Sequence, residues 1–413
     1  MPGPQSVCVV GLGYIGLPTA AAFATQGLQV LGVDVNERTI ETINRGEAPF
    51  TEPDLGIAIS GAVSLGRLVA SRTPAASDAF ILAVPTPFLP DRTADLQYIR
   101  AAAEAVAPVL KRNDLIVLES TSPPGTTVQL SRWLAELRPD LNWPHAAGEQ
   151  ADVHVAHCPE RVLPGRIMIE LVTNDRVIGG VSNRCAERAR ELYATFARGG
   201  LFLTDATTAE LVKLSENAYR DVNIAFANEL SLISDRLSVD VHEVIELANR
   251  HPRVNVLAPG PGVGGHCIAV DPWFIVSAAP EEARLIRMAR SVNDSKPGHV
   301  VAEVQKVARR FKEPVIATLG LSYKANVDDL RESPAVAIVE KLAAEEAGRL
   351  LLVEPHVDVL PSRLAGLGDL VGLAQAVTEA DVILLLVDHD AFRAIKRPAL
   401  RGKVLIDTRG VWR

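Results

Sequence analysis

The chain has 413 residues, of which 48% are hydrophobic and 22% are charged, and its formal net charge is -8. These proportions are ordinary for a globular protein, so they exclude a disordered, collagen-like or coiled-coil chain. The negative charge opposes a general affinity for nucleic acid or for an anionic membrane. The length exceeds what one compact core supports and predicts two or three domains.

The N-terminal segment MPGPQSVCVVGLGYIG has no basic stretch followed by a long apolar run, so no signal peptide is expected. No segment approaches the roughly 20 apolar residues that a membrane-spanning helix needs. The four cysteines, Cys8, Cys158, Cys185 and Cys267, are widely spaced and form no CxxC pair. They are expected to be reduced thiols, with no metal site among them, in a cytoplasmic protein.

The first half of the chain alternates short β-branched segments with helical periodicity. The expected strands are 7–10, 29–33, 80–84, 115–119, 153–157 and 201–204, and the expected helices are 14–26, 95–110 and 183–196. Strands that alternate with helices favour a parallel sheet covered on both faces.

The centre of the chain is helical, and the last 120 or so residues return to the alternating pattern. One long helix is expected from Thr207 to about Leu237, and shorter helices at 240–250 and 281–293 flank the loop APGPGVGGHCIAVDPW. The later expected strands are 315–320, 350–353, 382–387 and 404–407. The pattern predicts an α/β chain with two Rossmann-like, doubly wound parallel-sheet domains joined by a long central helix.

A glycine-rich turn follows the first expected strand. Gly11, Gly13 and Gly16 form G-x-G-x-x-G around Tyr14 and Ile15 at the start of a helix. Glycines at this spacing let a backbone approach a pyrophosphate at the helix N-terminus, although a tight turn can also need them for packing alone.

The acidic residue that ends the second strand supports the first interpretation. Asp34 lies 18 residues after Gly16, where a carboxylate hydrogen-bonds the adenosine ribose and repels a 2′-phosphate. The turn therefore predicts NAD as the cofactor, with NADP left open because Arg38 lies nearby.

Two further segments, VPTP (84–87) and ESTSPPGTT (119–127), come at the carboxyl ends of expected strands, where ligands of such sheets bind. Thr86, Ser120 and Thr121 are the candidate cofactor contacts there. The alternative is that these segments are only proline-rich turns.

Three polar clusters are candidates for the chemistry. Cys267 lies in GVGGHCIAVDP beside His266 and four residues before Asp271, where a glycine-rich loop allows a ligand to approach a thiol. Its alternative is a small buried apolar residue.

The second cluster lies on the long helix, where Lys213 and Asn217 share one face with Arg220 close by. The third is CPERVLPG (158–165), in which Glu160 is either a general base or one half of a structural ion pair.

The ordered motifs GLGYIGLP, VPTP, STSPPGTT, PERVLPG, TAELVKLSENAYRDVNIAFANEL, GVGGHCIAVDP and GLSYKANVDDLRESP resemble those of the UDP-glucose/GDP-mannose dehydrogenase family. Within the family, GPGVGGHCIAVDPWF is most similar to the branch that oxidises UDP-N-acetyl-D-mannosamine. The resemblance implies an NAD-dependent domain at 1–204, a helical and dimerisation domain with the cysteine loop at 205–295, and a UDP-binding domain at 296–413.

The resemblance also implies a four-electron oxidation of the C6 alcohol of a UDP-hexose to the uronic acid, through a thiohemiacetal and a thioester on Cys267. The implied catalytic residues are Cys267, Lys213, Asn217, Asp271, Glu160 and Thr121. Arg331 joins the cofactor set of Gly11, Gly13, Tyr14, Ile15, Gly16, Asp34, Arg38, Thr86, Ser120 and Thr121. The implied substrate-binding set is Glu160, Arg161, Val162, Lys213, Asn217, Arg220, His251, Arg253, Gly260, Gly264, His266, Tyr323 and Lys324.

Arg253 is expected to reach the active site of a neighbouring subunit, which makes a homodimer the expected assembly. Two alternatives stay open from the sequence. The sugar could be that of UDP-glucose or UDP-N-acetylglucosamine, or the chain could be a non-catalytic regulatory protein that binds sugar nucleotides.

Overall fold

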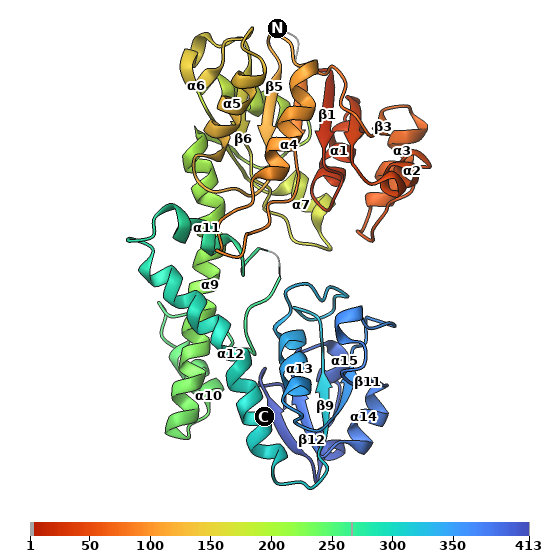
Figure 1. Ribbon diagram of the computed structural model, residues 1–413, viewed down its shortest axis with the longest axis vertical. Coiled ribbons are helices and arrows are strands. Elements are labelled where there is room, and N and C mark those ends of the chain that lie inside the picture. Colours follow the sequence, from red (N-terminus) through yellow and green to blue (C-terminus); the bar gives the residue numbers. More distant parts are fainter. Residues whose placement is uncertain (1–3, 266, 413) are drawn as a thin grey trace. The chain divides into compact units, whose positions relative to one another are not determined.

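A computed structural model describes residues 4–265 and 267–412 (Figure 1). The chain divides into two compact units. Unit 1 comprises Met1–Glu216 with Trp273–Ala279, and unit 2 comprises Asn217–Pro272 with Pro280–Arg413. Among the described residues, no helix is both long enough and apolar enough to cross a bilayer.

Unit 1 is built on an eight-stranded sheet of order β3-β2-β1-β4-β5-β6-β7-β8. Its strands are β1 (Ser6–Val10), β2 (Gln29–Val33), β3 (Leu68–Ser71), β4 (Ala79–Leu82), β5 (Leu115–Leu118), β6 (His154–His157), β7 (Arg176–Gly180) and β8 (Leu201–Asp205). Every neighbouring pair is parallel except β6 and β7, which are antiparallel. The predicted parallel sheet is confirmed, and the β6–β7 pair is a local exception to it. The sequence analysis predicted neither β3 nor β7.

Helices cover both faces of this sheet. They are α1 (Gly16–Thr25), α2 (Glu37–Asn44), α3 (Leu55–Ser64), α4 (Gln97–Val106), α5 (Thr126–Leu137), α6 (Pro144–Ala147), α7 (Ile167–Thr173) and α8 (Asn183–Tyr193), with 3-10 turns at Ala107–Val109 and Gly148–Gln150. Alternate residues of β1 enter different cores: Val7 and Val9 pack with α1 and α3, whereas Cys8 and Val10 pack with α4 and α5. This alternation is the period-2 pattern of a sheet buried on both sides.

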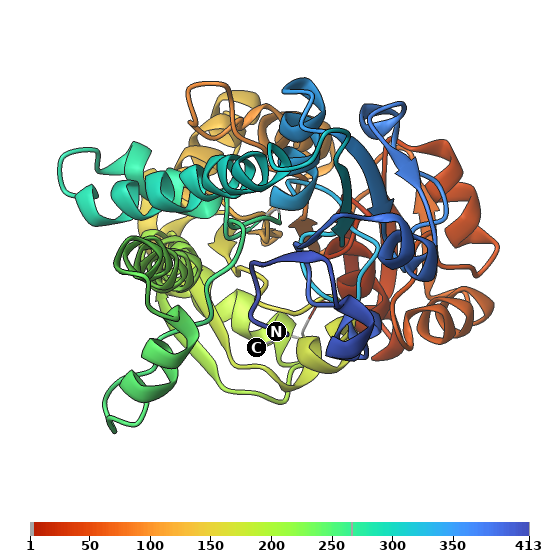
Figure 2. The ribbon, with the colours of Figure 1, turned by 90° about the horizontal axis from the view of Figure 1, so that it is seen from below.

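The long helix α9 (Ala206–Leu237) runs from unit 1 into unit 2 as 32 continuous residues. Figure 2 looks nearly along its axis. It is followed by α10 (Val241–Ala248), α11 (Asp271–Ala278) and α12 (Arg284–Ala308). The last helix is longer than the predicted 281–293 and contains Pro297. It continues beyond the proline because Val300, Val301 and Val304 are buried in the core of unit 2 and hold the next turns in place.

Unit 2 also contains a five-stranded, wholly parallel sheet of order β11-β10-β9-β12-β13. Its strands are β9 (Val315–Leu319), β10 (Arg349–Val353), β11 (Asp369–Leu370), β12 (Val382–Leu385) and β13 (Val404–Asp407). The remaining helices are α13 (Pro334–Ala344), α14 (Leu373–Glu379) and α15 (Asp390–Arg393), with 3-10 turns at Ser362–Leu364 and Arg397–Leu400. Helices α12 and α13 cover one face, and α14 and α15 cover the other.

Candidate active site

The fold requires only two of the three glycines in the first turn. A Cβ on Gly11, whose φ is +94°, would lie 2.6 Å from the carbonyl oxygen of Ala83, and one on Gly16 would lie 1.8 Å from that of Gly11. Packing therefore requires both glycines. Around Gly13 nothing lies within 4 Å of such a Cβ, so the surroundings within the fold do not explain this glycine. Open space at Gly13 is what a pyrophosphate beside the N-terminus of α1 needs.

Asp34 is held beside that turn by the backbone. Its Oδ2 accepts the N–H of Leu12 at 2.9 Å, and its Oδ1 accepts the N–H of Asn36 at 2.9 Å. The carboxylate is only half-buried, so it remains accessible to a ribose. Arg38 is exposed in the first turn of α2, and Tyr14 is exposed with its ring 4.3 Å from the ring of Phe50.

Buried polar atoms gather at the carboxyl ends of β4, β5 and β6. The Oγ of Ser120 donates to the carbonyl of Val84 at 2.6 Å, so this hydroxyl serves the fold. Within the described residues, the Thr86 Oγ1, the Ser122 Oγ and both ring nitrogens of His157 are buried without a hydrogen-bond partner. Buried polar atoms nearly always have a partner, so this edge of the sheet suits a bound polar ligand such as a nicotinamide or ordered water.

Two of these residues escaped the sequence analysis. Ser122 follows the predicted Thr121 directly, and His157 ends a strand that was predicted correctly. Burial lowers the pKa of the His157 imidazole to about 3, so the ring is neutral at physiological pH. Their signal in the sequence was their place at the ends of neighbouring parallel strands.

Lys213 and Glu160 meet in unit 1. The Lys213 Nζ donates to the backbone carbonyl of Glu160 at 2.7 Å. The Glu160 carboxylate turns elsewhere: its Oε2 lies 3.0 Å from the Nη1 of Arg176 in a buried ion pair, and its Oε1 accepts the N–H of Arg161 at 2.7 Å. Of the two interpretations of Glu160 from the sequence, the geometry matches the structural ion pair.

This ion pair belongs to a larger buried polar cluster. The hydroxyl of Tyr193 donates to Glu119 at 2.6 Å, and burial, followed by the nearby charge of Glu160, raises the pKa of the Glu119 carboxyl to about 7. Burial also raises the pKa of the Cys158 thiol to about 12, so this cysteine packs as an apolar residue. Arg161 extends outward and pairs with Glu216 at 2.5 Å, beside the half-buried Val162.

The loop that carries Cys267 lies in unit 2. The side chain of Cys267 is exposed, and its carbonyl accepts the N–H groups of Val270 at 3.1 Å and Asp271 at 2.9 Å, which turns the chain into α11. The Nδ2 of Asn217 donates to the Oδ2 of the buried Asp271 at 2.6 Å. Residues predicted from two separate motifs are thus joined, Asn217 of the long helix and Asp271 of the cysteine loop. His266 lies outside the described residues.

The glycines of this loop pack against Tyr323, a predicted substrate residue, and against Glu332, which follows the predicted cofactor residue Arg331. A Cβ on Gly264 would lie 2.5 Å from the carbonyl oxygen of Glu332, and one on Gly265 would lie 2.9 Å from the ring of Tyr323. Burial and then the charges of Asp329 and Cys267 raise the pKa of Tyr323. The ring of Tyr323 therefore packs against the loop that carries Cys267.

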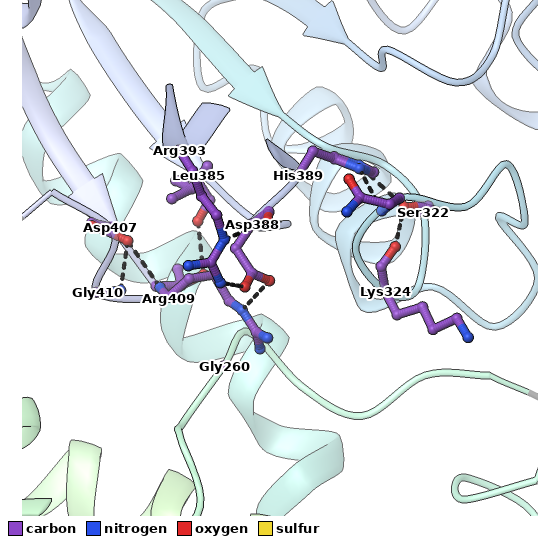
Figure 3. A network of polar contacts seen from close by, with 12 residues as sticks. Gly260, Ser322, Lys324, Leu385, Asp388, His389, Arg393, Asp407, Arg409 and Gly410 are labelled. Atoms are coloured by element: carbon purple, nitrogen blue, oxygen red, sulfur yellow. Dashed lines mark hydrogen bonds and ion pairs between the residues drawn. The ribbon is translucent and has the colours of Figure 1, made fainter. Parts of the chain in front are cut away.

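Figure 3 shows a polar network at the carboxyl ends of β12 and β13 that the sequence analysis missed. The Arg409 Nε donates to Asp388 at 3.0 Å, and Arg393 also pairs with this carboxylate. A Cβ on Gly260 would lie 2.5 Å from the Nη1 of Arg409, so Gly260 borders a guanidinium suited to phosphate. In the same view the side chain of Lys324 extends away from Ser322 and His389.

The remaining predicted residues lie at the surface. Arg220, His251 and Arg253 are exposed, and the N–H of Arg253 donates to the Nδ1 of His251 at 3.3 Å. Arg331 pairs with Asp329 at 2.7 Å. Arg331, which is also exposed, therefore has its guanidinium group engaged by a carboxylate of its own segment.

The glycine-rich turn with Asp34, set in a doubly wound sheet, is typical of the dinucleotide-dependent oxidoreductases. Three models of one family match the chain: the NAD-binding domain at residues 5–197, the central domain at 207–295 and the UDP-binding domain at 317–413. The chain belongs to the UDP-glucose/GDP-mannose dehydrogenase family, and it is an NAD-dependent dehydrogenase that acts on sugar nucleotides.

Relatives of known name support this assignment over the whole length. The chain is 59% identical over 408 residues to an NDP-N-acetyl-D-galactosaminuronic acid dehydrogenase of Ralstonia nicotianae, covering 99% of this chain and 96% of that protein. It is 53% identical over 416 residues to the UDP-N-acetyl-D-mannosamine dehydrogenase of Escherichia coli K12, covering 99% of each. A solved UDP-N-acetyl-D-mannosamine dehydrogenase of Pyrococcus horikoshii has a TM-score of 0.89 at 41% identity, covering 99% of this chain and 96% of that chain.

Proposed function

We propose that the chain oxidises the C6 alcohol of UDP-N-acetyl-D-mannosamine to the carboxylate through a covalent adduct of Cys267. The observation that carries the proposal is the group in unit 2, where an exposed thiol precedes a buried Asp271 that is hydrogen-bonded to Asn217. The sugar is supported by relatives named for it at 53% identity over the whole chain.

The residues of the chain have separate tasks in this scheme. Bound NAD+ would accept the hydride in each of the two oxidations. The Cys267 sulfur adds to the C6 aldehyde and so restores a tetrahedral carbon that carries a hydrogen. Asn217 and Lys213, one helical turn apart on α9, donate hydrogen bonds to the oxyanion, and Asp271 exchanges protons with the alcohol or with water.

Hydrolysis of the thioester then releases the acid and returns the thiol. The complete reaction consumes one alcohol, two NAD+ and one water, and yields one carboxylate, two NADH and three protons. We propose that Thr121 with Glu160 positions the water. The buried Arg176 ion pair supports a positioning role for Glu160, because it fixes the segment whose carbonyl accepts Lys213.

We assign the other predicted residues by location. The residues proposed to bind the cofactor are Gly11, Gly13, Tyr14, Ile15, Gly16, Asp34, Arg38, Thr86, Ser120 and Arg331. The residues proposed to bind the substrate are Arg161, Val162, Arg220, His251, Gly260, Gly264, His266, Tyr323 and Lys324. The domain boundaries at 204/205 and 295/296 stay predictions. The buried Cys8, Cys158 and Cys185 are thiols outside any disulfide, which supports a cytoplasmic location.

A panel of UDP-hexoses tests the sugar. Initial NADH formation is expected to give the highest kcat/KM with UDP-N-acetylmannosamine, at least about 100-fold above UDP-glucose, because a site built for the acetamido group rejects a sugar that lacks it. The N-acetylgalactosamine compound is a second candidate, since the Ralstonia relative is named for its acid. A preference for UDP-glucose would refute the assignment to an N-acetylated sugar.

We also propose that the chain is a homodimer in which Arg253 acts in the neighbouring active site. Tyr219, Phe226 and Ile233 recur every seven residues along α9 and are 71%, 54% and 47% exposed. Leu285 and Met288 on α12 are exposed as well. An apolar stripe of this kind is typical of a surface that a second subunit covers.

Mixed dimers test this proposal. Arg253→Ala and Cys267→Ser chains are each expected to be inactive alone and to recover about one quarter of wild-type activity when co-expressed. Half of the random dimers are mixed, and one of the two sites in each is intact. Failure to recover activity in dimers verified by gel filtration would place Arg253 in its own subunit's site, and a monomer would contradict the dimer itself.

A further inference from the structure

The loop that carries Cys267 begins at Gly260, whose buried N–H group is hydrogen-bonded to a side chain of the long helix α9. Gly260 lies between two prolines, and its N–H donates to the Oδ1 of Asn228 on α9 at 2.9 Å. Both residues are buried, and Asn228 is 0% exposed. A hydrogen bond at this depth fixes where the loop leaves the helices, because an unmet buried donor is costly.

The Asn228 side chain is also hydrogen-bonded to a second asparagine, Asn293. Its Nδ2 donates to the Oδ1 of Asn293 on α12 at 2.8 Å. The Nδ2 of Asn293 in turn donates to the Oδ1 of Asp221 at 2.8 Å and to its carbonyl at 3.1 Å. The three side chains form a continuous ladder of hydrogen bonds between α9 and α12.

The ladder ends at an ion pair between Asp221 and Arg290, and this pair determines which side chain donates and which accepts in each hydrogen bond. The Nη1 of Arg290 lies 2.6 Å from the Oδ1 of Asp221, and both side chains are buried. An ionised carboxylate only accepts hydrogen bonds, so Asn293 must turn its Nδ2 toward Asp221 and its Oδ1 toward Asn228. Asn228 must then present its own oxygen to Gly260. The negative charge of Asp221 therefore determines that Asn228 presents its Oδ1, and not its Nδ2, to the N–H of Gly260.

The other end of the loop is fixed by the same helix. Asn217 donates to Asp271 at 2.6 Å, and Asn217 and Asn228 are 11 residues, or about 16 Å, apart along α9. Cys267 lies in the segment between these two attachments. Both attachments belong to unit 2, as do Asn293, Asp221 and Arg290.

We propose that Asn228, oriented by Asn293 and Asp221, is a positioning residue that sets the place of the Cys267 thiol by holding Gly260. The proposal deepens the function above and rests on Cys267 being the nucleophile. Asn228 does not touch the reacting atoms; it acts through the loop. Misplacement of a nucleophile by about 1 Å costs on the order of 100-fold in rate.

Asn228→Ala tests the proposal by two readouts. The kcat for acid formation is expected to fall about tenfold or more, while the KM for NAD changes less than about twofold, because the glycine-rich turn lies in unit 1. Hydrogen exchange measured by mass spectrometry is expected to become faster in residues 260–271 and to stay unchanged in β1 and α1. Asn293→Ala is expected to act in the same direction, and the double variant to fall short of the product of the two effects.

Gln305→Ala is the matched control, since it removes a surface amide from α12, where Gln305 contacts Glu345. It is expected to leave both readouts unchanged. If Asn228→Ala does not fold, Asn293→Ala supplies the same test, because it keeps the Asn228 side chain and removes the amide that orients it toward Gly260. Wild-type kcat and exchange in either variant, or exchange that rises equally in every peptide, would overturn the proposal. Acid formation by Cys267→Ser would instead refute the proposed function and leave the exchange result interpretable.

Discussion

Cys267→Ser is expected to lower acid formation at least about 10³-fold, because a serine hydroxyl without a strong base is a far weaker nucleophile than a thiol. Of the four cysteines, Cys267 alone is exposed, and Cys8, Cys158 and Cys185 are buried. Burial raises the pKa of both Cys8 and Cys158 to about 12, so neither can supply a substitute thiolate. The measurement is the uronic acid formed in time, separated by anion-exchange chromatography.

The control for this variant is cofactor binding, measured by NADH fluorescence. Binding is expected to match the wild type, since the turn around Gly13 and the Asp34 carboxylate belong to the β1–α1–β2 segment of unit 1. Acid made at the wild-type rate by Cys267→Ser would exclude the covalent scheme.

Lys213→Ala is expected to lower kcat by about 10²-fold, the scale of one lost oxyanion donor. The ammonium group donates to the carbonyl of Glu160, and Glu160 is held separately by Arg176. Removal of the lysine therefore leaves this segment held by Arg176, while it takes away the ammonium group, its stem and its hydrogen bond to Glu160. The check is a steady-state comparison of kcat and KM for both substrates.

Lys213→Met is the matched variant, because it keeps the length of the side chain and removes the charge. A loss equal to that of Lys213→Ala would assign the effect to the charge. A change confined to KM in both variants would make Lys213 a binding residue without a role in the chemical steps.

Local patterns predicted much of the fold. The strands of both sheets were found except β3, β7 and β11, and α9 was predicted at 207–237 against an observed Ala206–Leu237. The strand β7 was missed because its sequence RVIGG carries an arginine and two glycines and depends on its neighbours in the sheet. Helix α12 was cut short for a similar reason, since burial of Val300 and Val304 outweighs the cost of Pro297.

The candidate site was predictable where its residues lie in recognisable motifs, and not where they meet across the chain. Cys267, Asp271 and Asn217 were singled out, but only the structure shows the hydrogen bond between Asn217 and Asp271. The pairs Asp388–Arg409 and Asn228–Asn293 join residues 21 and 65 positions apart, and no local pattern specifies such contacts. Asn228 lay within a motif that was recognised, yet its role depends on Gly260.

The stoichiometry of the reaction tests the central claim most directly. With limiting UDP-N-acetyl-D-mannosamine, excess NAD+ and the reaction run to completion, the account predicts two NADH and one uronic acid per sugar nucleotide consumed. A yield of one NADH with accumulation of the aldehyde would contradict a covalent, four-electron oxidation at Cys267.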